Sequence, residues 1–349
     1  MSLDDAEGIR KIDRSDMLSI MEMTPTRLAP PVNASSTCSP DPGTVDNVVF
    51  GGVGGSGIVG DIISDYCRGR TTVPLSVCRA FRIPAFVGKH TLFVAVSYSG
   101  NTRETLGQVE QAKRRDAKII AICSGGNLLS IAKSESIPYL KVPSGLLPRV
   151  ALPELVAAAV FAIGSARLSP DWTRALSEPS RLLSDLIKRV KPSVPTRQNS
   201  AKRMARALPN KLPLIICDEA YGSVLRRFKN ELNENSKMPA LCYTVPEGYH
   251  DDIEGLAALR QLTKPQPLLF RTRHELDGQR RTREQLTRLL SDLHFPPVLE
   301  FYGKGTSVLS QLLTAVAFAG YVSVYLAILR GVDPAELKVI PKFRQAMQS

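Results

Sequence analysis

The stretch Asn47-Val-Val-Phe-Gly-Gly-Val-Gly-Gly-Ser-Gly57 places a short apolar run directly before a cluster of five glycines. A short apolar run that ends in glycine is typical of a buried strand in a parallel sheet. We predict a helix after it, from about Gly57 to Tyr66. Glycines let a backbone approach an anion closely, and a helix N-terminus offers free N–H groups and partial positive charge. This stretch therefore predicts an α/β fold with an anion site after its first strand.

A second strand-to-helix turn, Ser97-Tyr-Ser-Gly-Asn-Thr102, places three small hydroxyl side chains and one amide around a single glycine. The oxygens of a phosphate monoester each accept several hydrogen bonds, so this composition suits phosphate. Helix capping is the alternative interpretation, because Ser, Asn and Thr are all good N-caps. Four such residues in six exceed what one cap needs, and we predict that both loops bind phosphate.

Strands and helices alternate along both halves of the chain, which predicts two doubly wound parallel sheets with helices on both faces. The second half repeats the architecture of the first without a close sequence repeat. The predicted strands are residues 47–50, 75–78, 92–97, 118–123 and 139–142, then 212–217, 240–245, 268–272 and 298–302. The predicted helices are residues 15–23, 57–66, 102–115, 128–134, 152–165, 223–233 and 282–293, a long helix to Leu329 and a short one near Pro341.

This alternation predicts four regions. They are an N-terminal helix and proline-rich connector over 1–46, a first α/β domain over 47–168, a basic helical linker over 169–210, and a second α/β domain over 211–349. Prolines at 179, 192, 195 and 209 are expected to break the helices of the linker.

The composition is that of an ordinary globular protein, with 349 residues of which 43% are hydrophobic and 22% are charged. The formal charge of +12 indicates either a basic surface or an anionic partner. Nucleic acid is disfavoured, because we find no zinc-finger spacing, RNA-binding aromatic motif or basic arm. The densest basic stretch, Arg271 to Arg288, also carries acidic residues, and we interpret it as a solvated loop and helix face.

Six cysteines without a C-x-x-C pair and only four histidines argue against a zinc site, so we expect no metal. Without a signal peptide, the simplest compartment is the reducing cytosol. Thr306 to Leu329 carries no formal charge and is long enough to span a membrane, but it contains several polar residues. We predict a buried helix rather than a membrane span there, with a subunit interface as one setting that would bury it.

Gly52, Gly54 and Gly57 also satisfy the G-x-G-x-x-G spacing of dinucleotide-binding loops. The second strand ends in Arg79 rather than in the acidic residue that would hold a ribose, although an arginine suits the 2′-phosphate of NADP. The hydroxyl-rich loop has no role in such a site, so a dinucleotide ranks below a sugar phosphate.

The helix from Ser223 ends in Asn233-Glu-Asn235, and the next strand ends in Pro246-Glu-Gly-Tyr-His-Asp-Asp252. We expect these two termini to point into one cleft, where an acid–base pair can be built from their side chains. Here the chain resembles the bifunctional phosphoglucose/phosphomannose isomerases, a family built from two sugar-isomerase (SIS) domains. The resemblance covers nearly the whole chain. The matching segments are Asp16-Met17-Leu18, Gly54-Gly-Ser56, Ser97 to Thr102, Pro148-Arg149 with Ala151-Leu152, Leu232 to Lys237, and Tyr325 to Pro334.

The resemblance implies an aldose–ketose isomerase that interconverts glucose 6-phosphate, and mannose 6-phosphate, with fructose 6-phosphate through a cis-enediol. It implies Glu234 as the base, Arg149 as the cation that stabilises the enediol charge, and His250 as the ring-opening group. Such chemistry needs a carboxylate and a cation but no cofactor. The family also implies a cytoplasmic homodimer that acts in glycolysis and gluconeogenesis. The implied substrate-binding residues are Gly54, Gly55, Ser56, Ser97, Ser99 and Thr102.

The chain departs from the family at two places. It has His250-Asp-Asp252 where the family usually has His-Asn-Glu, and it has Lys342 or Arg344 where the family usually has a basic residue, often Lys. Arginine stays charged, so Arg344 is a poor proton donor. A regulator that binds sugar phosphates without catalysis is the alternative function, and it would need neither Glu234 nor Arg149.

Overall fold

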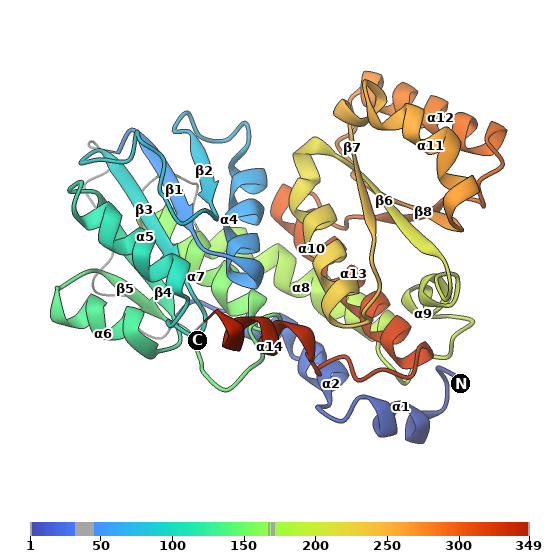
Figure 1. Ribbon diagram of the computed structural model, residues 1–349, viewed down its shortest axis with the longest axis horizontal. Helices are drawn as coiled ribbons and strands as arrows, with labels where there is room; N and C mark the ends of the chain where they lie inside the picture. The colour runs from blue at the N-terminus through green and yellow to red at the C-terminus, as the bar shows by residue number, and fades with distance from the viewer. Residues whose placement is uncertain (1, 32–44, 167, 169–171, 348–349) are drawn as a thin grey trace. The chain divides into compact units, whose positions relative to one another are not determined.

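A computed structural model describes residues 2–31, 45–166, 168 and 172–347. From residue 32 on, the predicted proline-rich connector lies outside the described residues. The chain forms two compact units (Figure 1). The first-sheet unit comprises Met23–Leu182 and Gly305–Leu312, and the second-sheet unit comprises Met1–Glu22, Leu183–Lys304 and Leu313–Ser349.

The first-sheet unit contains five parallel strands in the order β2-β1-β3-β4-β5. Val49 belongs to the core cluster under α5 and α6, whereas Phe50 faces α4, so helices cover both faces of the sheet. The predicted doubly wound fold is therefore confirmed for this half. The elements are β1 (Asn47–Gly51), α4 (Gly54–Cys67), β2 (Leu75–Cys78), β3 (Thr91–Val96), α5 (Arg103–Lys113), β4 (Lys118–Cys123), α6 (Gly126–Ser134), β5 (Tyr139–Lys141) and α7 (Leu152–Ser165).

The second-sheet unit contains four parallel strands in the order β7-β6-β8-β9. This order makes β6 the counterpart of β1, and β8 the counterpart of β3. The elements are β6 (Leu212–Asp218), η2 (Glu219–Tyr221), α10 (Gly222–Glu234), β7 (Leu241–Val245), η3 (Glu247–Tyr249), α11 (Asp252–Leu262), β8 (Pro265–Arg271), α12 (Asp277–Asp292) and β9 (Leu299–Tyr302).

Three helical features differ from the sequence-based prediction. Helix α11 was not expected, because Leu256 is its only buried residue and its apolar periodicity is weak. Pro179 lies inside α8 instead of breaking it. The N-terminal helix is three short helices, since Asp13 accepts hydrogen bonds from the Met17 and Leu18 N–H groups and starts a new helix. The remaining helices are α1 (Ala6–Ile12), α2 (Met17–Glu22), α3 (Thr24–Arg27), α8 (Trp172–Val190), α9 (Ser200–Arg206), α13 (Val308–Leu329) and α14 (Val339–Ala346).

The long apolar helix α13 is buried by its own chain. Among the described residues it is the one helix long and apolar enough to cross a membrane, and 89% of its most apolar window is buried. In the second-sheet unit, the Phe318 ring stacks on Phe301 with centroids 3.8 Å apart, and the Tyr325 hydroxyl donates to the Val190 carbonyl. The predicted buried helix is therefore confirmed. A subunit interface is not needed to explain its burial, so α13 gives no argument for a dimer.

The N-terminus of α13 is held by the Glu178 carboxylate of α8. Glu178 accepts hydrogen bonds from the N–H and hydroxyl groups of Thr306, at 2.9 and 2.8 Å. It also accepts from the Ser307 N–H at 3.0 Å and the Ser310 hydroxyl at 2.8 Å. Burial raises the pKa of this carboxyl, but the hydrogen bonds outweigh burial and hold its pKa far below the usual range. The ionised carboxylate is therefore the form that the folded chain prefers.

We expect Glu178→Gln to lower the free energy of unfolding at neutral pH by about 1–2 kcal/mol, as the loss of a helix cap does. A carboxyl whose pKa is depressed by folding stabilises the protein above its unfolded pKa, and this contribution is lost as pH falls toward the folded pKa. The difference between wild type and variant in urea midpoint should therefore shrink below about pH 4. Glu110→Gln, on the exposed face of α5, is the control. A difference that does not change with pH would contradict the ionised cap.

Candidate active site

The glycine-rich loop joins β1 to the first turn of α4. Val53 is the N-cap of α4 and makes no side-chain cap hydrogen bond, so the first N–H groups of the helix have no side-chain cap. The backbone is tight here, because a Cβ at Gly52 would lie 2.7 Å from the Val96 carbonyl oxygen. Gly54 has a φ of +57°, which favours glycine. The predicted residues Gly54, Gly55 and Ser56 thus form the N-terminus of a helix that suits an anion.

The hydroxyl-rich loop follows β3. Ser97 is 1% exposed, and its hydroxyl lies 2.9 Å from the Thr102 hydroxyl. Thr102 is the N-cap of α5 but makes no side-chain cap hydrogen bond, so its hydroxyl is not used for capping. Ser99 lies exposed at the tip of the loop. Gly100, at a φ of +68°, leaves no room for a side chain, because a Cβ would lie 1.8 Å from the Gly125 carbonyl oxygen.

The two loops lie beside each other at the carboxyl edge of the first sheet. Their strands β1 and β3 are neighbours, and the Tyr98 N–H donates to the Ser56 hydroxyl at 3.2 Å. In a sheet of order 2-1-3-4-5, the strand order reverses between β1 and β3, and ligands bind at this switch point. The structure therefore brings the predicted phosphate residues of both loops to one place.

Arg79, the residue that would suit an NADP 2′-phosphate, is paired within the protein. Its guanidinium forms an ion pair with Asp61 of α4 and donates to the Gly57 carbonyl at 3.0 Å. It therefore connects the end of β2 to the first turns of α4, which follow the glycine-rich loop. This pairing gives the dinucleotide interpretation no support.

Arg149 lies in a turn next to the glycine-rich loop. The turn is closed by hydrogen bonds from the Val150 and Ala151 N–H groups to the Leu147 carbonyl, at 2.9 and 3.2 Å. Arg149 is 5% exposed, so its side chain is buried rather than a charge on the protein surface. A buried guanidinium near an anion site suits the stabilisation of negative charge on a substrate.

Glu234 is the last residue of α10, in the second-sheet unit, and it is half-buried. The residues after it are fixed. The buried Asn235 amide donates to the Ser323 hydroxyl at 2.9 Å, and the Ser236 hydroxyl donates to the Leu232 carbonyl at 2.8 Å. These hydrogen bonds fix the backbone that follows Glu234, and the position of the Glu234 side chain depends on that backbone.

His250 lies at the other edge of the same sheet, which corrects the expectation of one cleft. Strands β6 and β7 are parallel, so α10 between them runs in the opposite direction, and Glu234 lies before the start of β7. His250 follows the end of β7 and is exposed. The five residues of β7 span about 15 Å. Within one chain, His250 and Glu234 therefore do not form an acid–base pair.

Arg344 and Lys342 lie on α14, which has no buried residues. Both side chains are exposed on the C-terminal helix of the second-sheet unit. The structure thus gives neither residue a buried site that would favour proton transfer over a charged surface role.

Lys237 is a residue whose role the sequence analysis missed. Its backbone has a φ of +53°, and its ammonium donates to the carbonyls of Glu234, Asn235 and Asp333 at 2.9, 3.1 and 2.7 Å. It therefore satisfies the free carbonyls at the C-terminus of α10. A lysine directly after a predicted helix end was the available signal.

A buried ion pair on α10 was also missed. Arg227 and Glu231 are 4% and 6% exposed and their charged atoms lie 2.6 Å apart. Their spacing of four residues on a helix was the signal that the sequence offered. Glu231 lies about one turn and Arg227 about two turns before Glu234 on the same helix.

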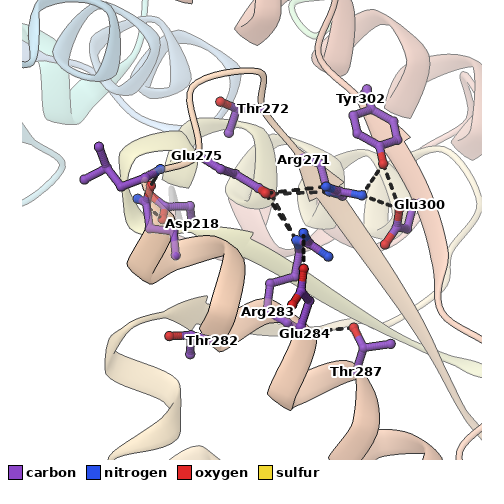
Figure 2. A network of polar contacts seen from close by, with 12 residues as sticks. Asp218, Arg271, Thr272, Glu275, Thr282, Arg283, Glu284, Thr287, Glu300 and Tyr302 are labelled. Atoms are coloured by element: carbon purple, nitrogen blue, oxygen red, sulfur yellow. Dashed lines mark hydrogen bonds and ion pairs between the residues drawn. The ribbon is translucent and has the colours of Figure 1, made fainter.

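An ion-pair network lies at the carboxyl edge of the second sheet (Figure 2). Glu275 accepts hydrogen bonds from Arg271 and Arg283 at 3.3 and 3.2 Å, and Arg271 also pairs with Glu300 and lies over the Tyr302 ring. The Arg271 and Arg283 side chains are only 18% and 13% exposed, although more than half of the residues from Arg271 to Arg288 are exposed. The solvated loop and helix face predicted for this stretch therefore describes most of it, but not these two arginines. Strand β8 is the counterpart of β3, so the segment after β8 corresponds to the hydroxyl-rich loop after β3. In the second sheet this segment carries the Glu275 carboxylate, which lies between two arginines. We therefore expect phosphate at the first sheet.

Comparison with known proteins first defines the class. Residues 45–137 match the SIS domain, and residues 197–347 match the bacterial phospho-glucose isomerase C-terminal SIS domain. A glucose-6-phosphate isomerase like protein from Thermus thermophilus has the same fold, with a TM-score of 0.65 and 17% identity over 99% of each chain. So does the C-terminal domain of glucosamine-fructose-6-phosphate aminotransferase from Francisella tularensis, with a TM-score of 0.67 and 17% identity over 92% of this chain and 97% of that one. The chain is thus a protein of two SIS domains.

Sequence relatives then define the family. The bifunctional phosphoglucose/phosphomannose isomerase of Caldicellulosiruptor bescii is 34% identical, over 85% of this chain and 88% of the relative. That of Thermoplasma acidophilum is 32% identical, over 87% and 90%. A D-glucosamine-6-phosphate 4-epimerase of Sulfolobus acidocaldarius is 28% identical, over 86% and 89%. The chain belongs to the bifunctional phosphoglucose/phosphomannose isomerase family.

Proposed function

We propose that this protein interconverts glucose 6-phosphate and mannose 6-phosphate with fructose 6-phosphate. The observation that carries the proposal is the pair of phosphate-type loops at the switch point of the first sheet, with Ser97 and Thr102 in hydroxyl contact. The relatives from Caldicellulosiruptor bescii and Thermoplasma acidophilum are bifunctional phosphoglucose/phosphomannose isomerases, which supports the proposal. No finding favours a regulator that binds without catalysis.

The proposed phosphate site uses side chains and two helix N-termini. Ser56, Ser97, Ser99 and Thr102 supply hydroxyl donors, and Gly54 and Gly55 supply backbone N–H groups at the start of α4. The dipoles of α4 and α5 add positive potential where the dianion binds. Binding energy from the phosphate then holds the sugar carbons for the reaction.

The proposed chemistry is a proton transfer between adjacent carbons. Glu234 takes the proton from C2 of the open-chain aldose and returns it to C1, while a proton moves from the hydroxyl on C2 to the aldehyde oxygen on C1. The intermediate is a cis-enediol, and Arg149 stabilises the negative charge on its oxygens. Mannose and glucose phosphates differ only in the face of C2 that gains or loses the proton.

Ring opening is assigned to His250, and the position of His250 supports the proposed homodimer. Within one chain His250 lies beyond the far end of β7 from Glu234. A homodimer would let His250 act on a substrate bound by a partner subunit. The place of the family's terminal basic residue is taken by Lys342 or Arg344, and both are exposed on α14. Arg344 would stay charged, so of these two only Lys342 is an alternative to His250 for this proton.

We also propose a cytoplasmic enzyme of glycolysis and gluconeogenesis, with the domain limits given by residues 47–168 and 211–349. None of the five cysteines among the described residues forms a disulfide bond, which suits a reducing compartment. The substrates are proposed to be hexose 6-phosphates, with no nucleic acid, membrane or cofactor as partner.

The phosphate site is tested by Ser99→Ala. We expect KM for fructose 6-phosphate to rise by about tenfold with kcat little changed, because one hydrogen bond to a charged group is lost. Ser130→Ala, on the exposed face of α6, is the control and should leave KM unchanged. An unchanged KM for Ser99→Ala would place the phosphate elsewhere.

A further inference from the structure

The side chain of Tyr98 reaches from the hydroxyl-rich loop to the segment that carries Arg149. Tyr98 is 5% exposed, and its hydroxyl oxygen accepts a hydrogen bond from the Leu146 N–H at 2.8 Å. Leu146 directly precedes the turn at Leu147–Ala151 in which Arg149 lies. One phenol oxygen therefore connects the proposed phosphate site to the proposed catalytic arginine.

The backbone of Tyr98 is fixed at the same time. Its N–H donates to the Ser56 hydroxyl at 3.2 Å. Its carbonyl accepts from both the N–H and the hydroxyl of Ser124, at 2.9 and 2.6 Å. The ring thus extends from a backbone that is held between the glycine-rich loop and the loop after β4. A displacement of the phosphate loops would move the phenol oxygen with them.

The far end of the arginine turn is held by a buried ion pair. Arg27 of α3 donates to the Val150 carbonyl at 2.6 Å and binds both carboxylate oxygens of Glu154. The Arg27 and Glu154 side chains are 14% and 6% exposed. The near end has the Tyr98 hydroxyl, and a Cβ at Gly55 would contact the Pro148 carbonyl at 3.5 Å. The turn is therefore fixed at one end by Arg27 and at the other by Tyr98.

We infer that Tyr98 is a positioning residue, which sets the place of the Arg149 guanidinium relative to a bound phosphate. The inference rests on the proposed function, because Arg149 matters only if it stabilises the enediol charge. Sub-ångström placement of such a cation affects the rate strongly, since it must meet charge that develops only in the transition state. In the proposed role, Tyr98 acts through Arg149 and does not itself contact the reacting carbons.

The protonation state of the Tyr98 hydroxyl agrees with this role. Burial raises the pKa of Tyr98, and the Glu154 carboxylate raises it further. The hydroxyl is therefore protonated at neutral pH. Its oxygen remains a neutral acceptor for the Leu146 N–H.

The test is Tyr98→Phe, which removes only the oxygen that accepts from Leu146. We expect kcat to fall about tenfold, with KM for fructose 6-phosphate changed by less than about twofold. Thermal unfolding measured on the same sample checks that the variant is folded at the assay temperature. Tyr139→Phe, which removes the phenol oxygen of a half-buried tyrosine on β5 of the same unit, is the matched control and should keep kcat within about twofold.

A double-mutant cycle with Arg149→Met separates positioning from general loosening. If Tyr98 acts through Arg149, Tyr98→Phe lowers kcat in the wild-type background but changes it less than about twofold in the Arg149→Met background. Equal losses in both backgrounds, or an equal loss in Tyr139→Phe, would overturn the inference. A normal kcat for Tyr98→Phe would overturn it too, provided that Arg149→Met is impaired. A normal kcat for Arg149→Met would instead overturn the proposed role of Arg149.

Discussion

Glu234→Gln is expected to lower kcat for isomerisation by about 10³-fold, while fructose 6-phosphate still binds with nearly wild-type affinity. Glutamine keeps the shape of the side chain at the end of α10 and the fixed backbone of Asn235 and Ser236. It cannot accept and return a carbon-bound proton. The phosphate loops belong to the first-sheet unit and are unchanged by the substitution.

Steady-state turnover and equilibrium binding of fructose 6-phosphate by the same preparation measure the two effects separately. The control is Glu254→Gln, an exposed carboxylate on α11 in the same unit. Control turnover should match the wild type. Normal turnover by Glu234→Gln would show that another group moves the proton.

Arg149→Met is expected to lower kcat/KM by about 10²–10³-fold, the usual effect of removing one group that stabilises an oxyanion. Methionine keeps much of the length and apolar surface of the buried side chain but carries no charge. The loss should appear mainly in kcat, because the enediol charge exists only in the transition state and intermediate.

A ground-state role for Arg149 would give a different result. If the guanidinium bound the phosphate of the substrate, KM would rise and kcat would stay the same. Arg114→Met, a surface arginine after α5, is the control for loss of one positive charge from the same unit. Wild-type kcat/KM in Arg149→Met would remove Arg149 from the catalytic group.

Sequence predicted the fold well where side chains are buried on both sides. The strands β1, β3, β4 and β6 each contain a buried run of apolar residues, and each predicted strand lies in the observed sheets. It missed α11, whose single buried residue leaves almost no periodic signal. The prediction that Pro179 breaks the helix was wrong, because α8 continues through it. The packing of α8 outweighs the one backbone hydrogen bond that a proline removes.

The candidate site was likewise predictable from the sequence only in part. The two phosphate-type loops were visible as local composition, and parallel pairing of β1 with β3 brings them together. Glu234 and His250 are close in sequence, and only the direction of α10 between the parallel strands β6 and β7 shows that they lie at opposite edges. The contacts of Tyr98 with Leu146 and of Lys237 with Asp333 join segments whose spacing carries no pattern. Such contacts depend on tertiary packing and could not be predicted from one sequence.

The most direct test of the central claim is turnover by the purified protein with a chelator present. Glucose 6-phosphate, mannose 6-phosphate and glucosamine 6-phosphate are offered separately, and fructose 6-phosphate formation and 4-epimer formation are measured. We predict that both glucose 6-phosphate and mannose 6-phosphate yield fructose 6-phosphate, and that glucosamine 6-phosphate yields no 4-epimer. Binding of fructose 6-phosphate without conversion of either aldose would contradict the account and would make the protein a sugar-phosphate-binding regulator.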